Sequence, residues 1–221
     1  WSGDRGLTLV EQGPFGVIGA ITPSTNPSET VLCNSIGMLA AGNSVVFNPH
    51  PSAIGVSSFA VSLVNKASIM AGGPGSIAAT VKKPTLATAD VMYKSKDIPL
   101  LVATGGPGVV TAVLSTGKRA IGAGAGNPPV VVDETADIPH AAESIINGAT
   151  LDNNLPCIAE KEVVVVDSVA DELIAEMQNC GAYLLKDADK IAKLSEMVVV
   201  PNKKGKMAVS RDWVGRDAYK F

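Results

Sequence analysis

The chain has 221 residues, of which 46% are hydrophobic and 18% are charged. This composition is typical of a globular protein with enough apolar mass for a sizeable core, in one domain or two. The formal net charge of -3 gives no basic excess, so the sequence argues against nucleic acid and anionic membranes as partners. We find no apolar run of membrane-spanning length and no signal peptide at the start.

The three cysteines, Cys33, Cys157 and Cys180, stand at irregular spacing. This spacing favours neither a disulfide framework nor a zinc site, so we expect a reducing, cytoplasmic compartment. The chain begins without Met, and residues 218–221 have the pattern of an amphipathic helix cut short. We therefore expect the chain to be an excerpt from a longer polypeptide.

Apolar runs of strand length alternate with helical patterns along the first part of the chain. The predicted strands are residues 17–21, 44–48, 77–81, 100–104, 119–122 and 130–132. They are almost continuously apolar, as strands buried on both faces are. The predicted helices are residues 27–41, 52–71, 85–93 and 108–115. Repeated strand–helix alternation predicts an α/β fold with a doubly wound parallel sheet.

Capping residues mark the ends of the predicted helices. Asn26 precedes Pro27 as an N-cap, and Glu29 follows it at a position close to a capping box. Gly42 and Gly72 come just after helical patterns, where glycine provides a left-handed stop.

A second strand–helix rhythm begins near Val130. The boundary is predicted in the glycine-rich stretch 122–129, which gives domains of residues 1–129 and 130–221. Within the second domain we expect a helix, a polar Asp-Asn-Asn segment followed by Cys157, a strand and another helix, at residues 138–147, 152–154, 162–166 and 169–178. The Lys-Lys-Gly-Lys stretch 203–206 is interpreted as a solvated loop rather than a phosphate site.

Three segments follow predicted strands at the edge where an open parallel sheet binds ligands. They are Thr22-Pro23-Ser24-Thr25-Asn26-Pro27, Pro49-His50-Pro51-Ser52 and Thr104-Gly105-Gly106-Pro107-Gly108. Small residues and free amides at helix starts suit a diphosphate. Such turns are as common for steric reasons, and the residues alone leave both interpretations open.

Neither of two common phosphate-binding motifs, the P-loop and the Gly-x-Gly-x-x-Gly dinucleotide-binding motif, fits this sequence. Residues 112–119 have Ala where a P-loop begins with Gly, and Arg where it needs Ser or Thr. The stretch Gly-Ala-Gly-Ala-Gly at 122–126 lacks the Gly-x-Gly-x-x-Gly spacing and follows the last strand of its domain rather than the first.

Cys157 stands out among the cysteines by its context. It follows Asp-Asn-Asn and Leu-Pro, and a nearby helix N-terminus would activate a partly exposed thiol at this point. The alternative is a small buried hydrophobic residue, the commonest role of a lone cysteine. Cys33, on the apolar face of the first helix, and Cys180, near a helix end, are interpreted as structural. His140 is interpreted as an exposed helix residue, and no Ser-His-Asp or metal-binding set is evident.

Taken together, these segments resemble the aldehyde dehydrogenase superfamily. The resemblance is carried by Pro14-Phe15-Gly16-Val17-Ile18-Gly19, the three strand-end segments, Ala40-Ala41-Gly42-Asn43, the glycine-rich stretch 122–129 and Asp152-Asn153-Asn154 ahead of Cys157. It is to the coenzyme-A-acylating propionaldehyde and acetaldehyde dehydrogenases of bacterial microcompartments, and residues 209–217 are similar to the ethanolamine-utilisation branch. Family members are about twice this length, so the resemblance implies an internal fragment that lacks part of the cofactor domain and much of the catalytic domain.

Two departures from the hydrolytic relatives bear on the reaction. Counted from Lys118-Arg119, their general-base glutamate falls at Ala123, and alanine cannot activate water against an enzyme thioester. A surviving thioester is open to coenzyme A, whose thiolate is already a good nucleophile. Asn48 stands where those relatives often have a ribose-binding lysine, which argues weakly against selection for NADP.

The resemblance implies which residues form the site. Cys157 is the expected nucleophile, and its amide with the Asn26 side chain is expected to hold the oxyanion; Asn26 as a plain helix cap is the competing interpretation. The residues expected to bind the cofactor are Thr22, Pro23, Ser24, Thr25, His50, Pro51, Thr104, Gly105, Gly106, Gly122 and Ala123.

The implied reaction is oxidation of propanal or acetaldehyde to its acyl-coenzyme A, with NAD as cofactor and coenzyme A as co-substrate. The resemblance also implies a homo-oligomer in the cytoplasm that is packaged with microcompartment shell proteins. Two other classes stay open from the residues: a non-catalytic nucleotide-binding module, and a cysteine acyltransferase or hydrolase that uses no nicotinamide.

Overall fold

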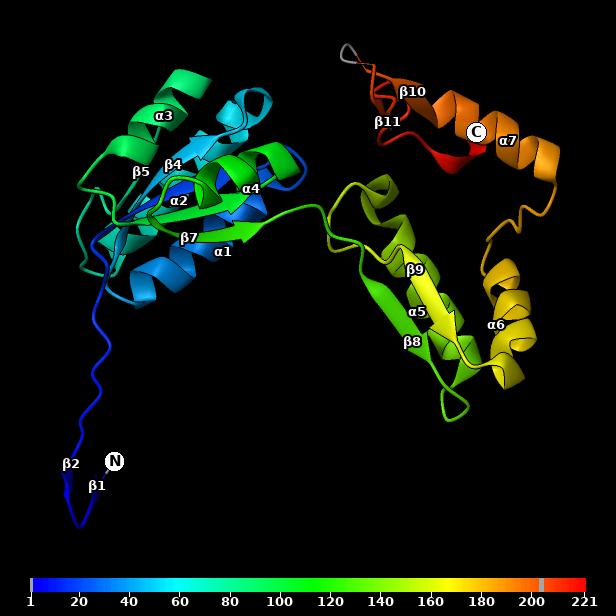
Figure 1. Ribbon diagram of the computed structural model, residues 1–221, viewed down its shortest axis with the longest axis horizontal. Coiled ribbons are helices and arrows are strands. Elements are labelled where there is room, and N and C mark those ends of the chain that lie inside the picture. The colour runs from blue at the N-terminus through cyan, green and yellow to red at the C-terminus, as the bar shows by residue number, and fades with distance from the viewer. Residues whose placement is uncertain (1, 203–204) are drawn as a thin grey trace. The chain divides into compact units, whose positions relative to one another are not determined.

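The computed structural model describes residues 2–202 and 205–221, so Lys203 and Lys204 of the predicted solvated loop lie outside the described residues. The chain forms two compact units, Trp1–Ala125 and Gly126–Phe221, which Figure 1 traces from blue to red. The division falls slightly before the predicted boundary after Pro129. Pro129 is already the first residue of a strand in the second unit, which is why the linker ends earlier.

A five-stranded sheet forms the centre of the first unit, with strand order β5-β4-β3-β6-β7. The strands are β3 (Val17–Thr22), β4 (Ser44–Pro49), β5 (Ala78–Thr80), β6 (Leu100–Thr104) and β7 (Arg119–Ala123). All neighbouring pairs are parallel, so the predicted doubly wound parallel sheet is confirmed. The predicted strand ends are right to within about one residue, because each strand is a compact apolar run between turn residues.

Helices cover both faces of this sheet (Figure 1). They are α1 (Pro27–Ala40), α2 (Ile54–Met70), α3 (Leu86–Lys94) and α4 (Pro107–Leu114), with the short 3-10 helix η1 (Pro51–Ala53) before α2. Val31 of α1 and Val61 of α2 pack with Phe47 in one core cluster. Met92 of α3 and Val113 of α4 pack in the other cluster, on the opposite face. Adjacent residues of the central strands β3 and β4, such as Ala20 and Ile21, therefore serve opposite cores, which explains their unbroken apolar character.

Two glycines at helix ends adopt the expected left-handed conformation, Gly42 with φ +78° and Gly72 with φ +81°. Asn26 and Pro27 occupy the N-cap and first position of α1, as predicted. The capping box is wrong, because Asn26 makes no side-chain cap bond and Glu29 instead accepts from the neighbouring Ser28 hydroxyl.

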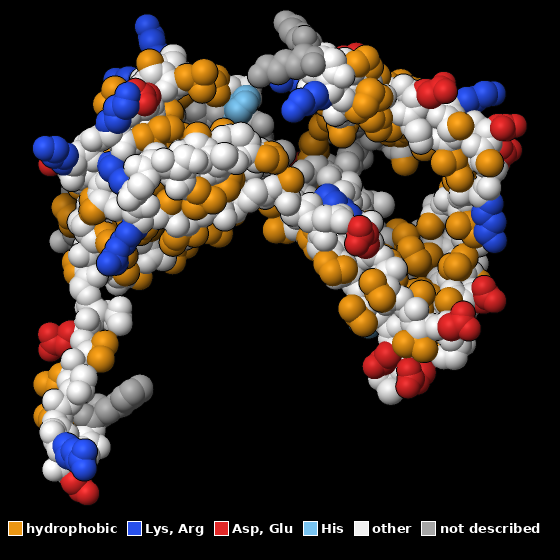
Figure 2. Space-filling view, in the orientation of Figure 1, with side chains coloured by type: hydrophobic (Ala, Val, Ile, Leu, Met, Phe, Trp, Pro, Cys, Tyr) orange, Lys and Arg blue, Asp and Glu red, His pale blue; other side chains and the backbone are white. Residues whose placement is uncertain are grey.

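Helix α2 corrects one expectation from the sequence. The stretch Pro51–Met70 is long and apolar enough to cross a membrane, by length and composition, with 22% of its apolar window buried. Ala60 and Val61 on its inner side belong to the sheet's core cluster, whereas Phe59 and Leu63 are exposed. The helix thus covers the sheet with one side and presents apolar groups on the other. Figure 2 shows that orange, hydrophobic side chains also reach the visible surface of this unit.

The second unit is built on a βαβ arrangement. Its parallel strands β8 (Pro129–Val132) and β9 (Glu162–Val165) are connected through α5 (Ile138–Thr150), and α6 (Asp167–Asn179) packs beside α5. Val132, Ile145 and Leu173 lie in their shared core cluster. These elements were predicted, although α5 runs on beyond the predicted end at residue 147.

Several short or exposed elements were not predicted. They are β1 (Ser2–Gly3), β2 (Gly6–Leu7), α7 (Ala188–Val198), β10 (Val199–Pro201) and β11 (Met207–Val209). No residue of α7 is buried, although Ile191, Leu194 and Val198 recur at helical spacing, so the sequence signal for this helix was present and was missed. The expected amphipathic helix at residues 218–221 is a single 3-10 turn, η3 (Ala218–Lys220).

Candidate functional site

The strand order places a topological switch point between β3 and β6, because the chain leaves β3 toward β4 on one side and later returns to β6 on the other. Ligands of open α/β sheets bind at this point, beyond the carboxyl ends of the strands. Thr22 pairs in register with Pro49, and Ile21 pairs with Ala103. The structure therefore brings the three predicted strand-end segments to one edge of the sheet.

The first two of these segments are tied together at their bases. The His50 amide donates to the Thr22 carbonyl at 3.0 Å. The Ser52 amide donates to His50 Nδ1 at 3.2 Å, which places the proton of a neutral His50 ring on Nε2. The Thr22 side chain is 2% exposed, and its hydroxyl has no partner among the described residues. This edge therefore carries small, fixed polar groups on rigid strand ends.

The glycines at the crevice separate the two interpretations that the sequence left open. A Cβ at Gly105 or Gly106 would meet no atom within 4 Å, so packing in this chain does not require glycine at either position. A Cβ at Gly122 would lie 2.6 Å from Val110 Cγ1, which gives that glycine a steric role against α4. Packing therefore explains the glycine at position 122, whereas it does not explain Gly105 and Gly106 at the β6–α4 turn.

Asn26 lies half-buried at the start of α1. Its side-chain oxygen accepts from the Thr25 hydroxyl at 3.1 Å, and its carbonyl accepts from the Thr30 hydroxyl at 2.8 Å. Within the described ranges no hydrogen bond uses its amide nitrogen, and the side chain does not cap the helix. Asn26 is thus the N-cap residue of α1 by position, as the competing interpretation expects, but its side chain makes no cap hydrogen bond.

The two positions that depart from the hydrolytic pattern have clear surroundings. Ala123 ends β7, where its side chain is exposed and its carbonyl accepts from the Gly105 amide at 3.1 Å. Asn48 is 5% exposed and accepts from the Thr88 hydroxyl at 3.0 Å, so it serves the packing of α3 on the sheet. Ahead of Ala123, Lys118 donates to the Ile98 and Ser95 carbonyls.

Cys157 of the second unit follows a run of left-handed residues. Asp152, Asn153 and Asn154 have φ values of 47°, 51° and 59°. Asn and Asp are the side-chain-bearing residues that tolerate this conformation best, and each such residue still carries some strain. Asp-Asn-Asn therefore reverses the chain sharply after α5 and delivers it into the turn that holds Cys157.

Hydrogen bonds from two side chains hold that turn. Asn154 Nδ2 donates to the Ala149 carbonyl at 2.7 Å and to the Glu160 carbonyl at 3.0 Å. Lys161 Nζ donates to Asn154 Oδ1 at 2.6 Å, to the Pro156 carbonyl at 3.2 Å and to the Ala159 carbonyl at 3.1 Å. The nucleophile segment, residues 154–161, is thus tied to the end of α5 and to the start of β9.

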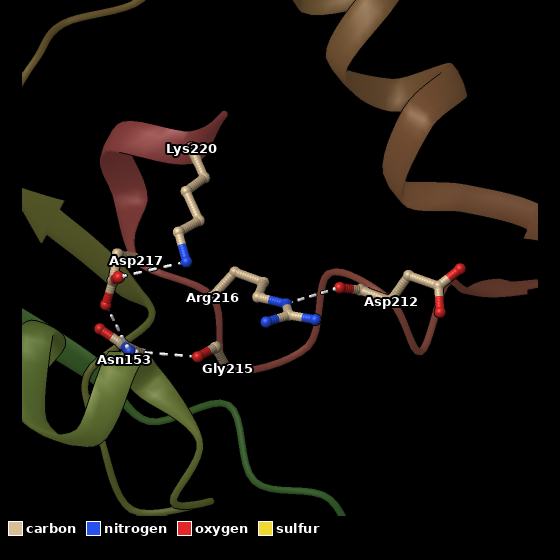
Figure 3. A network of polar contacts seen from close by, with 6 residues as sticks. All are labelled: Asn153, Asp212, Gly215, Arg216, Asp217 and Lys220. Carbon is tan, nitrogen blue, oxygen red and sulfur yellow. Dashed lines mark hydrogen bonds and ion pairs between the residues drawn. The ribbon is translucent and has the colours of Figure 1, made fainter.

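Two neighbouring segments of the same unit also contact the nucleophile segment. A Cβ added to Gly126 would collide with the Cys157 carbonyl, so the glycine-rich stretch passes directly against the cysteine backbone. A Cβ of Gly215 would lie 3.0 Å from Leu155 Cδ1. Asn153 Nδ2 donates to the Gly215 carbonyl and to Asp217 Oδ1, both at 3.1 Å, as Figure 3 shows.

The remaining expectations about cysteines and histidines need two corrections. Cys157 is half-buried, and its turn leads into β9, so the expected nearby helix N-terminus does not follow the thiol in the chain. Cys33 is exposed on α1 instead of packed in the core, and Cys180 is exposed after α6. His140 is exposed on α5, as predicted. In the described part of the chain no cluster of His, Cys, Asp and Glu could hold a metal ion.

The comparison with known families decides what this arrangement is. The family model described as the aldehyde dehydrogenase family matches residues 2–193. The chain belongs to the aldehyde dehydrogenase family. An acetylating acetaldehyde dehydrogenase of Salmonella typhimurium is 53% identical over 223 residues, which cover 100% of this chain and 47% of that protein. The chain thus spans about half the length of the curated relatives it matches.

Solved structures agree with this assignment. The propionaldehyde dehydrogenase of the Clostridium phytofermentans fucose-utilisation microcompartment is 63% identical, with a TM-score of 0.85, and 100% of this chain covers 49% of it. A propionaldehyde dehydrogenase of Rhodopseudomonas palustris, with bound coenzyme A and an acylated cysteine, is 55% identical with a TM-score of 0.84, over 99% of this chain and 49% of that one. The predicted resemblance to the acylating, microcompartment-linked aldehyde dehydrogenases is confirmed.

Sequence reasoning missed the side chains that hold the nucleophile segment. Three successive Asp and Asn residues are a usable signal for left-handed backbone, because few other residues adopt it. Lys161 gave no signal, since a lysine between two glutamates has the pattern of a solvated surface. The packing of Gly126 on Cys157 joins residues 31 positions apart, and no local pattern encodes it.

Proposed function

We propose that this chain supplies the nicotinamide crevice and the nucleophile of a coenzyme-A-acylating aldehyde dehydrogenase that acts on propanal or acetaldehyde. The first unit takes the role of the cofactor domain, and the second takes the role of the first part of the catalytic domain. The observation that carries the proposal is Cys157, a half-buried thiol in a turn held from both sides, in a chain of this family. The acylated cysteine of the Rhodopseudomonas relative supports the same role for Cys157.

The proposed reaction starts with addition of the Cys157 thiolate to the aldehyde carbon. The resulting oxyanion is held by the Cys157 amide. The family resemblance alone assigns a second donor, the Asn26 side-chain amide, which makes no capping bond in the described residues. Bound NAD would supply the hydride acceptor, and loss of hydride from the former aldehyde carbon would convert the Cys157 thiohemiacetal to a thioester. The thiolate of coenzyme A then attacks this thioester, takes the acyl group and releases the Cys157 thiolate.

The crevice of the first unit suits NAD by its backbone. Gly105 and Gly106 leave open space at the β6–α4 turn, and the start of α1 after Thr25 presents backbone amides that suit a diphosphate. The His50 turn contributes by its position, because its Ser52 and Ala53 amides already donate to His50. Thr22, with an unpartnered hydroxyl, and the segment Pro23-Ser24-Thr25 line the switch point. Among the proposed cofactor residues, Gly122 also has a packing role, because it lets α4 lie close to β7. Its proposed contribution to the cofactor site is to set the position of the end of β7.

Ala123 fits transfer to a thiol rather than to water. It carries no group that could take a proton from water, so the thioester would persist until coenzyme A arrives. We further propose that the full-length protein is a homo-oligomer that is packaged with microcompartment shell proteins in the cytoplasm. This location is proposed from the Clostridium relative, which belongs to a fucose-utilisation microcompartment.

A single assay separates this function from the two alternatives. The full-length protein that contains this chain is mixed with propanal, NAD and coenzyme A, and absorbance of reduced nicotinamide and formation of propanoyl-coenzyme A are followed. We expect both signals, and acyl-coenzyme A only when all three compounds are present. Binding of NAD without turnover would identify a non-catalytic nucleotide-binding module. Acyl transfer or hydrolysis with an added acyl ester or thioester in the absence of NAD, together with no reaction of propanal, would identify a cysteine acyltransferase or hydrolase.

A further inference from the structure

We propose that Lys161 is a positioning residue for the nucleophile, and that its ammonium group holds the turn on which Cys157 is presented. This inference rests on the proposed function, because it assigns a role to Lys161 in the reaction of Cys157. It adds a residue that touches neither aldehyde nor cofactor but fixes the backbone of the residue that does.

The ammonium group of Lys161 is fully used by this turn. A lysine ammonium has three N–H donors. The structure gives them three oxygen acceptors, Asn154 Oδ1 at 2.6 Å, the Pro156 carbonyl at 3.2 Å and the Ala159 carbonyl at 3.1 Å. Two of these carbonyls lie on either side of Cys157 in the chain. The same group therefore holds the backbone before and after the thiol.

Lys161 is itself anchored to the sheet of its unit. Its amide donates to the Pro128 carbonyl at 3.1 Å, immediately before β9 pairs with β8. Asn154, the third partner of its ammonium group, is fastened to the end of α5 through the Ala149 carbonyl. The ammonium group thus connects the Cys157 turn to β9 and, through Asn154, to α5. These two elements pack in one core cluster.

Apart from Lys161, the turn is held by the Asn154 side chain on the Glu160 carbonyl, by the close approach of Gly126 to the Cys157 carbonyl and by burial of Ala159. One backbone hydrogen bond closes it, from the Ala159 amide to the Pro156 carbonyl at 3.2 Å. Ile158, next to the thiol, is 69% exposed and adds little packing in this chain. A reaction that needs both the Cys157 thiolate and the Cys157 amide in fixed places depends on the orientation of this turn.

The ordinary alternative is a solvated surface lysine. Exposed lysines usually pair loosely with a carboxylate, and such pairs contribute little. Lys161 stands between Glu160 and Glu162, yet its ammonium group forms an ion pair with neither. It turns to three oxygens of the nucleophile segment instead, which favours the positioning role.

The test uses the full-length protein that contains this chain. Lys161→Met removes the donors and keeps a similar apolar stem, whereas Lys161→Arg keeps charge and donors. Lys193→Met, at an exposed position of α7, is the matched control. The measurements are the single-turnover rate of reduced-nicotinamide formation, the dissociation constant for NAD, and backbone hydrogen exchange of peptides that cover residues 151–161.

We expect Lys161→Met to slow the single-turnover rate roughly 10- to 100-fold, the scale of a nucleophile misplaced by about an ångström. NAD affinity should stay unchanged, exchange should accelerate in residues 151–161 alone, and Lys161→Arg should recover a large part of the rate. An unchanged rate in Lys161→Met overturns the proposal. An arginine variant as slow as the methionine variant also overturns it, because the loss would then come from packing.

Two further outcomes are decided by separate measurements. If Lys161→Met does not fold, Asn154→Gly becomes decisive, since glycine accepts the left-handed backbone. This change removes the Oδ1 acceptor of the ammonium group together with the Nδ2 bonds that tie the turn to the Ala149 and Glu160 carbonyls. A normal single-turnover rate in that variant overturns the proposal. If the unmodified protein forms no acyl-coenzyme A, the proposed function fails, whereas hydrogen exchange still reports whether Lys161 holds the turn.

Discussion

The two units fix their candidate site residues in different ways. In the first unit, the crevice is made of strand ends and helix starts, with Gly105 and Gly106 in open space. In the second unit, the Cys157 turn is held by side chains, through Asn154 and Lys161, after three left-handed residues. A diphosphate needs many weak donors on a rigid edge, which backbone provides. A nucleophile needs its reacting atom held in a fixed position, and a turn outside helices and strands provides this only with added hydrogen bonds.

The largest expected effect removes the nucleophile and leaves the crevice. We expect Cys157→Ala in the full-length protein to abolish aldehyde oxidation, because no other group can form the thioester, while NAD binding stays nearly intact. Activity and NAD affinity are measured together. Cys33→Ala and Cys180→Ala are matched controls at exposed positions. Loss of activity in either control, or substantial turnover in Cys157→Ala, would move the nucleophile elsewhere.

A change in the crevice should alter the acceptor instead of the nucleophile. General-base assistance is typically worth about a hundred- to ten-thousand-fold, or roughly 3 to 5 kcal/mol of barrier. We therefore expect Ala123→Glu to raise free-acid formation without coenzyme A and to lower the share of acyl thioester. Product analysis separates the outcomes. A folded variant that binds NAD and still yields only thioester would show that Ala123 does not protect the intermediate.

The glycine-rich stretch offers a matched pair of substitutions that sharpen the comparison. Gly126→Ala forces a Cβ into the Cys157 carbonyl, whereas Gly124→Ala places a Cβ in open space. Overpacking of this kind costs about 1–3 kcal/mol. We expect Gly126→Ala to lower both the melting temperature and the rate of thioester formation, with Gly124→Ala close to the unmodified protein. Equal effects of the two substitutions would contradict the packing of this stretch on Cys157.

The smallest expected effect concerns the exposed turn at residues 133–135, which hydrogen bonds to the Asp133 side chain hold. The hydroxyl and the amide of Thr135 donate to Asp133 Oδ1 at 2.6 Å and 2.9 Å, and these bonds lower the pKa of Asp133. The stabilisation is present above the unfolded-state pKa and is lost as pH falls through the lower folded-state pKa. We expect Thr135→Ala to raise the Asp133 pKa, seen by NMR titration, and to destabilise the protein slightly at neutral pH and not in acid. An unshifted titration would show that the amide bond alone sets this pKa.

The sequence alone determined the parallel sheet, its strand ends and the edge at which three loops meet. Each of these follows from local signals. They are unbroken apolar runs, helices that begin at Pro27 and Pro107, and left-handed glycines such as Gly42 and Gly72. It also singled out Asn26 and Cys157 for site roles through resemblance. Their surroundings were less well predicted, since Asn26 makes no side-chain cap bond and no helix begins at Cys157.

Tertiary structure decided which side chains hold the site in place. The ammonium group of Lys161 finds its acceptors only because α5, the left-handed run and β9 bring Asn154, Pro156 and Ala159 around it. The glycine-rich stretch 122–126 looked uniform in sequence, yet Gly122 packs on Val110, Gly124 is open and Gly126 meets Cys157. Local sequence sets backbone preference through sterics and burial period, whereas a hydrogen-bond partner or a collision distant in the chain exists only after the elements have packed.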